Sequence, residues 1–141
     1  MTLYTETSAL LSWFFSAARG DDVRRALGGA SAVVTSELAV FEVERALIRN
    51  IVERRLTETA GARLRVLMTH IMSGWSVVAI TSEILASGRS RFPKEPVRAL
   101  DAIHLGTLLV TRTSVPDLQL LSLDDRVRDN ARLLGFTVLP S

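Results

Sequence analysis

Short apolar runs alternate with longer amphipathic segments along the whole chain. The short runs are rich in β-branched and aromatic residues, which favours strands, and Ser, Thr or Asp precedes most of the longer segments, as helix starts require. The predicted strands cover residues 3–6, 32–35, 75–80, 118–122 and 136–139. The predicted helices cover about residues 8–15, 22–27, 37–53, 57–72, 82–88, 96–111 and 124–134. This alternation indicates an α/β fold with a parallel sheet covered by helices on both faces.

The length and composition of the chain predict one domain over residues 1–141, since no repeat, linker or low-complexity segment divides it. Apolar residues make up 48%, which is enough for a core. The absence of cysteine excludes a disulfide framework and a thiolate metal site. No apolar run is long enough for a membrane span, and the first strand follows Met1 without room for a signal peptide. We therefore expect a cytoplasmic protein without membrane contact.

Four carboxylates stand at strand ends or in apolar helical surroundings. They are Glu6 at the end of the first predicted strand, Glu42 in the helix after the second, Asp101 in the helix over 96–111, and Asp124 after the fourth strand. In a doubly wound sheet the first and fourth strands can flank the switch point, where open α/β sheets bind ligands. Two helices can then bring the remaining acids to the same edge, because right-handed crossovers place all strand carboxyl ends together.

The two acids at strand ends also have structural interpretations. Asp124 can simply begin its helix, since Ser122 and Asp125 have the spacing of a capping box. Glu6 can be a solvated strand end. Both alternatives remain open at this point, because each acid alone is compatible with either interpretation.

The two acids on helices differ in how easily they are explained. Glu42 can pair with Arg45 or Arg49 on the same helical face. Asp101 is surrounded by leucine, isoleucine and alanine. Aspartate is unfavourable within a helix, and a charge among apolar side chains is costly unless it is paired or bound to a metal. Asp101 is therefore the strongest single candidate for a site.

The combination of four acids implies a bound cation. Carboxylates brought close together repel and raise one another's pKa, and a divalent cation removes this conflict. A donor set of oxygens, without cysteine or clustered histidine, favours Mg²⁺ or Mn²⁺. Such a site suits phosphodiester hydrolysis, since the metal activates a water and stabilises charge on the phosphate oxygens.

The charged residues give only weak support for a nucleic-acid partner. The formal net charge is +2, and Lys94 is the one lysine among 17 basic residues. Arginine pairs bidentately with phosphate and stacks on bases. Codon bias in a GC-rich genome explains the same preference. Arg45 and Arg49 follow Glu42 on one side of its helix, so we keep them as candidate RNA-phosphate contacts, with a solvated face as the alternative.

At these residues the sequence resembles PIN-domain ribonucleases, in particular the VapC toxins of bacterial toxin–antitoxin pairs. The resemblance covers essentially the whole chain, and its motifs are specific in combination rather than singly. The motifs are Thr7-Ser8-Ala9-Leu10 after the first acid, Ser36-Glu-Leu-x-x-x-Glu42-Val-x-Arg45-Ala46-Leu47, Leu100-Asp101-Ala102-Ile103-His104-Leu105, and Ser122-x-Asp124 followed by Ala131-Arg-x-x-Gly135.

The resemblance implies a three-layer α/β/α domain with a central sheet of five parallel strands. It also implies a Mg²⁺-dependent endoribonuclease that leaves a 5′-phosphate and a 3′-hydroxyl, with Glu6, Glu42, Asp101 and Asp124 as the acids that bind the metal. A homodimer and a VapB-like antitoxin, whose tail fills the acidic groove, are the implied partners. One residue departs from the family pattern, which normally has Asp where this chain has Glu6. The extra methylene is expected to weaken metal binding or to favour Mn²⁺, because Mg²⁺ requires near-octahedral geometry.

Two side chains next to these motifs have less certain roles. Ser122 can hold a metal-bound water through its hydroxyl, or it can serve as a turn or cap residue. His104 shares a helix face with Asp101, but a histidine beside a core-facing run is usually structural, so we favour that interpretation over a general base. His70 lies late in an amphipathic helix and is interpreted as a surface or interface residue.

Three classes of function are compatible with an α/β domain that carries an acidic edge. The leading one is a metal-dependent endoribonuclease toxin. The second is a PIN domain that binds RNA or its antitoxin without cutting, which the departure at Glu6 favours. The third is a phosphoacceptor receiver domain. It ranks last because it requires a lysine after the last strand region, whereas Lys94 lies in a proline-containing loop.

Overall fold

The computed structural model describes residues 1–16 and 18–141; residue 17, in the predicted connection after the first helix, lies outside the described residues. Its centre is a five-stranded sheet with the order β3-β2-β1-β4-β5, in which all pairings are parallel. The strands are β1 (Thr2–Thr5), β2 (Ala32–Ser36), β3 (Ser76–Val78), β4 (Gln119–Leu121) and β5 (Val138–Leu139). Strand β1 lies between β2 and β4, so the switch point is beside β1, as the sequence predicts.

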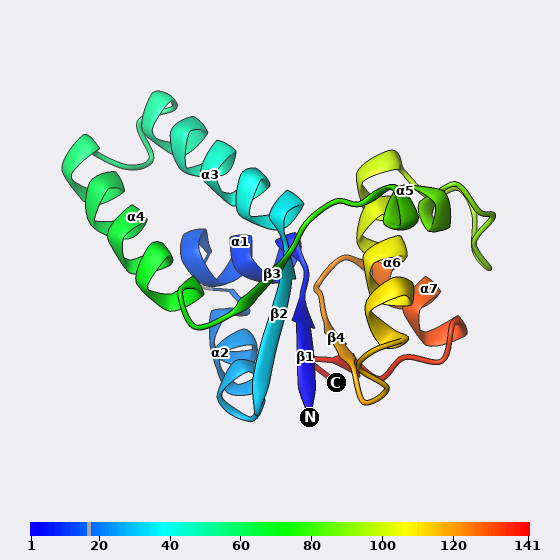
Figure 1. Ribbon diagram of the computed structural model, residues 1–141. Helices are drawn as coiled ribbons and strands as arrows, with labels where there is room; N and C mark the ends of the chain where they lie inside the picture. The colour runs from blue at the N-terminus through cyan, green and yellow to red at the C-terminus, as the bar shows by residue number, and fades with distance from the viewer. Residues whose placement is uncertain (17) are drawn as a thin grey trace.

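Helices cover both faces of the sheet and give three layers (Figure 1). Helices α1 to α4 lie on one side, and α5 to α7 lie on the other. Their bounds are α1 (Thr7–Phe15), α2 (Gly20–Gly28), α3 (Glu37–Val52), α4 (Glu58–Met72), α5 (Ser82–Gly88), α6 (Ala99–Arg112) and α7 (Asp125–Leu133). The predicted α/β class, the parallel sheet and the three-layer architecture are therefore confirmed.

The sheet supplies a separate apolar cluster to each helical layer. In β1, Leu3 packs with residues of α1 and α2, whereas its neighbour Tyr4 packs with residues of α6 and α7. Leu120 and Leu121 divide in the same way in β4. Successive side chains of a strand point to opposite faces, so two adjacent apolar residues serve two cores. The central strands are therefore packed on both faces, and this packing fixes the positions of the residues at their carboxyl ends.

Several helix boundaries follow from caps that are visible in the sequence. The side chains of Ser36, Thr57 and Thr81 each accept a backbone N–H at the start of α3, α4 and α5. After α7, Gly135 adopts φ +90°, a conformation that glycine reaches without steric cost. Within the described residues, no helix is long and apolar enough to cross a membrane.

The predicted start of the helix after the proline-containing loop is wrong. Helix α6 begins at Ala99 rather than Pro96. The Glu95 carboxylate accepts the backbone N–H groups of Phe92 and Val97 at 2.9 and 2.6 Å, and these bonds hold the loop in place beyond Pro96. Asp101 therefore lies in the first turn of α6, where a negative charge is favourable, and not in mid-helix.

Two smaller predictions about element ends also need correction. The third and fifth strands are shorter than predicted, and α1 begins at Thr7 with Glu6 as its N-cap residue. Neither Thr7 nor Ser8 caps that helix. Both hydroxyls are instead directed to acids, Thr7 to Glu42 and Ser8 to Glu6.

Candidate acidic site at the carboxyl edge of the sheet

The register of β1 and β4 brings the ends of these strands side by side. Thr5 pairs with Leu121, and the backbone N–H of Glu6 donates to the Leu121 carbonyl at 3.0 Å. Glu6 and Ser122 are the residues that follow this pair. We call the four carboxylates Glu6, Glu42, Asp101 and Asp124, together with the strand ends that they surround, the acidic edge.

Glu6 is buried, with 4% of its surface exposed. Its Oε2 accepts hydrogen bonds from the Ser122 hydroxyl at 2.8 Å and from the Ser8 hydroxyl. Burial raises the pKa of the Glu6 carboxyl, against the opposing effects of the nearby His104 and of these two hydroxyls. The alternative that Glu6 is a solvated strand end is therefore wrong. A buried acid with a raised pKa is a recurring mark of functional sites.

Arg98, the residue directly before α6, bridges two of the four acids. Its Nε donates to Asp101 Oδ2 at 3.0 Å, and one of its terminal nitrogens lies 3.4 Å from Asp124 Oδ2. The pKa of Arg98 is raised by Asp101 first, then by Asp124 and more weakly by Glu6. Three acids of the acidic edge thus lie within the electrostatic reach of one guanidinium, which is mostly exposed to solvent.

Asp124 caps its helix, as the structural interpretation predicts, and its second carboxylate oxygen faces the acidic edge. Its Oδ1 accepts the backbone N–H of Val127 at 3.0 Å and caps α7, while Oδ2 faces Arg98. The proposed capping box is wrong in detail, because the Ser122 hydroxyl donates to Glu6 rather than capping the helix. Ser122 also accepts the backbone N–H of Asp124 at 3.1 Å, so this hydroxyl connects the two acids at the strand ends.

Glu42 faces the sheet from α3. Its Oε1 accepts the Thr7 hydroxyl at 2.8 Å and lies 3.1 Å from His104 Nε2. Burial raises the pKa of the Glu42 carboxyl, but the hydrogen bonds from His104 and Thr7 outweigh burial, so the net pKa is lowered. Among the ion pairs of the described residues, Glu42 pairs with neither Arg45 nor Arg49, and that structural alternative is wrong.

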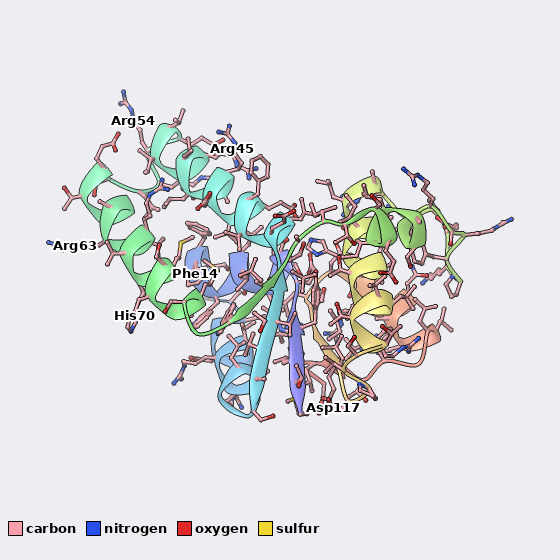
Figure 2. The ribbon with its side chains drawn as sticks, viewed as in Figure 1. Phe14, Arg45, Arg54, Arg63, His70 and Asp117 are labelled. Carbon is pink, nitrogen blue, oxygen red and sulfur yellow. The ribbon has the colours of Figure 1, made fainter. Side chains whose placement is uncertain are left out.

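The two candidate phosphate contacts lie on the outer surface of α3. Arg45 and Arg49 are exposed and border a shallow cavity with Ile48 and Val52. Figure 2 shows Arg45 on the α3–α4 hairpin, directed away from the sheet. These arginines therefore do not reach into the acidic edge. If they contact RNA, they do so on the outer surface of α3.

The carboxylate oxygens of the acidic edge are suitable ligands for a hard divalent cation, although the four side chains do not converge on one position. Within residues 1–16 and 18–141, no three acid or histidine side chains form a cluster ready to hold a metal ion. Carboxylate oxygens are the ligands that Mg²⁺ and Mn²⁺ prefer. The observation that supports the fit is Arg98: a positively charged group lies where Asp101 and Asp124 meet.

The sequence alone did not identify every residue that shapes this site. The sequence assigns no role in it to Arg98, Thr7 or Ser8, and it favours a structural role for His104. A signal for Arg98 was present, since it stands three residues before Asp101, a spacing that places two side chains on one helical face. The contacts of Thr7 and Ser8 depend on pairing between distant segments and have no comparable local signal.

A family model for the PIN domain matches residues 3–133. The chain therefore belongs to the PIN domain family, as its sequence motifs predict. Its relatives in that family include Ribonuclease VapC46 of Mycobacterium tuberculosis, to which it is 31% identical over 137 residues, covering 97% of this chain and 95% of that protein. The predicted resemblance to VapC proteins is thus confirmed.

Solved structures with the same fold include a toxin–antitoxin complex and a VapC toxin. A toxin–antitoxin complex from Klebsiella pneumoniae matches with a TM-score of 0.66 and 18% identity, covering 100% of this chain and 98% of that chain. The VapC20 toxin of Mycobacterium tuberculosis, described as cleaving the sarcin–ricin loop, matches with a TM-score of 0.65 and 16% identity, covering 96% of each chain. At these identities the likeness concerns the fold.

Proposed function

We propose that this protein is a metal-dependent endoribonuclease toxin of the VapC type, acting in the cytoplasm. The observation that carries the proposal is the acidic edge: a buried Glu6 at the end of β1, with Asp101 and Asp124 bridged by Arg98 at the neighbouring strand end. Ligands bind at such switch points in open α/β sheets. The relationship to VapC46, which is named a ribonuclease, supports cleavage of RNA.

The proposed metal ligands are Glu6, Glu42, Asp101 and Asp124, and the proposed ion is Mg²⁺ or Mn²⁺. A divalent ion at such a site lowers the pKa of a bound water and stabilises negative charge on phosphate oxygens. The protein contributes the positions of the four carboxylates. Ser122 and Ser8 hold Glu6 through its Oε2, and Ser122 is also the proposed contact for a metal-bound water.

A cation held by Asp101 Oδ2 and Asp124 Oδ2 would replace the contacts that Arg98 makes with these two oxygens. The side chain of Arg98 is 65% exposed, so its guanidinium can turn toward solvent without a rearrangement of the core. The side chain of Asp101 is only 12% exposed, so a bound cation would have to balance the charge that the guanidinium balances now. The released guanidinium then lies next to the acidic edge, where a substrate phosphate would approach. Arg45 and Arg49 extend the same positive character along α3 as proposed RNA contacts.

The test is incubation of the purified protein with RNA under each divalent metal. We expect cleavage in Mg²⁺ or Mn²⁺, loss of cleavage with EDTA, and products with a 5′-phosphate and a 3′-hydroxyl. The competing function is a PIN domain that binds RNA or an antitoxin without cutting. It is favoured by the incomplete convergence of the four acids. Absence of cleavage under every divalent metal, together with retained RNA binding, would establish that alternative.

Glu6 provides a first prediction on activity. We expect Glu6→Asp to raise Mg²⁺-dependent cleavage severalfold and to reduce the preference for Mn²⁺, because a shorter carboxylate restores the side chain that is usual in the family. The measurement is the cleavage rate as a function of Mg²⁺ and Mn²⁺ concentration. The control is Glu58→Asp on the exposed start of α4, which makes the same chemical change at the outer end of the α3–α4 hairpin (Figure 1). An unchanged rate for Glu6→Asp would mean that the extra methylene does not limit activity.

The proposed partner is a VapB-like antitoxin, and the proposed state without it is a homodimer. Related folds have been solved as toxin–antitoxin complexes, including VapBC2 of Rickettsia felis bound to a promoter DNA fragment. That structure matches with a TM-score of 0.60 and 7% identity, covering 98% of this chain and 97% of that chain.

On this protein, a groove of about 550 Å³ lies between α1 and the end of α3. Its apolar lining includes Leu11, Phe14, Phe15 and Leu56, with Arg49 and Arg55 also bordering it.

Leu56 provides a prediction on that partner. We expect Leu56→Glu to weaken binding of the antitoxin encoded beside the toxin gene by roughly 10- to 100-fold, since burial of a leucine contributes about 1.5–3 kcal/mol. Val66→Glu, at an exposed apolar residue of α4 outside the groove, is the matched control. Both complexes are measured by calorimetry with purified components. Equal affinities for the two variants would place the antitoxin elsewhere.

A further inference from the structure

We propose that His104 is a positioning residue that fixes the carboxylate of Glu42 at the acidic edge through its Nε2–H group. This inference rests on the proposed function, in which Glu42 is a metal ligand. His104 lies on α6, one helical turn after Asp101, and only 1% of its surface is exposed. The role differs from that of a general base, because the imidazole acts on Glu42 and contacts no reacting atom.

The hydrogen bonds around the imidazole determine which nitrogen carries the proton. The Thr7 hydroxyl has one proton, and this proton is donated to Glu42 Oε1. His104 Nε2 lies 3.0 Å from the Thr7 oxygen and 3.1 Å from Glu42 Oε1. Neither oxygen can donate to Nε2, since the hydroxyl proton is already used and the carboxylate is ionised. Nε2 must therefore be the donor to both oxygens.

The second ring nitrogen anchors the imidazole to the sheet. Nδ1 lies 2.8 Å from the Tyr4 hydroxyl, and Tyr4 is fully buried in β1. With a proton on Nε2, a neutral imidazole accepts the Tyr4 proton at Nδ1, whereas an imidazolium donates its Nδ1–H to the Tyr4 oxygen, so this bond anchors the ring in both states. The resulting chain runs from the tyrosine hydroxyl through the imidazole to the glutamate. It links the central strand β1 directly to a side chain of α3.

The hydrogen bonds of Thr7 and His104 hold one carboxylate oxygen of Glu42 and leave the other oxygen available for a ligand. Both donors, Thr7 and His104, contact the same atom, Oε1. A glutamate side chain is otherwise flexible, and the side chain of Glu42 is 27% exposed. Fixing one oxygen removes rotamer freedom before a cation binds, which lowers the entropic cost of binding. Outer partners of metal ligands commonly act in this way.

A purely structural histidine is the competing interpretation, in which His104 only satisfies the buried Tyr4 hydroxyl. Three variants separate the two roles in the full-length protein. His104→Gln can place an amide N–H near the position of Nε2, whereas His104→Asn is shorter and reaches only toward Tyr4. His104→Leu removes both contacts. Mn²⁺ binding to each metal-free variant is measured by calorimetry, after circular dichroism has shown that the variant is folded.

We expect the Asn and Leu variants to bind Mn²⁺ about 10- to 100-fold more weakly than the wild type, and the Gln variant to stay within roughly threefold of it. Wild-type affinity in the Asn or Leu variant would overturn the proposal, as would a Gln variant that is as weak as Leu. If the Leu variant does not fold, the comparison of Gln with Asn decides, since these two differ mainly in the reach of one amide.

A second measurement needs neither metal nor RNA. Long-range ¹H–¹⁵N correlation spectra of the metal-free protein report the tautomer of each imidazole, and the chain has two histidines, so a His70→Gln variant assigns the signals. We expect Nε2 of His104 to be protonated and its proton resonance to shift in Glu42→Gln. A proton on Nδ1 alone, or no shift, overturns the proposal. Failure of the wild type to bind Mn²⁺ or to cleave RNA would instead refute the proposed function, and the spectra would still decide the role of His104.

Discussion

Asp101→Asn is expected to abolish RNA cleavage, with a loss of at least about 100-fold, the upper end of what removal of an outer partner of a metal ligand costs. The substitution removes a charge from the proposed ligand set while keeping the size of the side chain. Asp101 is buried at 9% exposure, and its Oδ2 contacts Arg98. An amide at this position can neither balance the guanidinium nor bind a hard cation as strongly as a carboxylate.

The control for this substitution is Asp117→Asn. Asp117 is exposed and precedes β4 at the opposite end of the sheet, as Figure 2 shows. Cleavage of a defined RNA is followed in Mg²⁺ and in Mn²⁺, and circular dichroism compares the folds of the two variants. We expect wild-type rates from Asp117→Asn. Retained cleavage in Asp101→Asn would remove this acid from the proposed ligand set.

Gly106→Ala is expected to lower the free energy of unfolding by about 1–3 kcal/mol, the usual cost of inserting a methyl group into a filled space. A Cβ atom on Gly106 would lie 2.7 Å from the carbonyl oxygen of Ile84 and 3.0 Å from the backbone nitrogen of Gly88. Both atoms belong to the backbone of α5, so no flexible side chain can move aside. The higher helix propensity of alanine, worth at most about 1 kcal/mol, offsets only part of this cost.

Gly28→Ala is the matched control, because Gly28 is also helical but an added Cβ would meet no atom within 4 Å apart from its chain neighbours and the nearby backbone of its own helix. We expect its stability to be unchanged or slightly increased. Thermal and urea denaturation of both variants give the free energies of unfolding, and the midpoint temperature of Gly106→Ala should fall by on the order of 10 °C. Equal stability of the two variants would show that α5 and α6 separate without cost.

The sequence predicts the order of elements well, because strands and helices here are encoded locally. Apolar runs define the strands, and caps such as Ser36 and Thr57 define helix starts. The predicted start of α6 is wrong because the bonds of Glu95 to Phe92 and Val97 override the tendency of Pro96 to begin a helix. A turn held by a side chain leaves no clear pattern in the residues around it.

The sequence motifs point to the four acids but not to the groups that contact them, and the role of these acids as metal ligands stays a prediction. Each acid has a short motif around it, and strand topology was sufficient to group Glu6 with Asp124. The contacts of His104 with Tyr4, Thr7 and Glu42 join segments that are distant in the sequence. Such contacts depend on the packing of α6 against β1 and α3, and a single sequence carries no local record of them.

The pairing of β1 with β4 has a consequence for synthesis of the protein. Glu6 emerges early from the ribosome, but β4 is made near the end of the chain, and Ser122 and Asp124 follow it. The neighbouring positions of these residues exist only after β4 has inserted beside β1. A nascent chain therefore lacks the assembled acidic edge throughout most of its translation, because the last contributing segment is among the last to leave the ribosome.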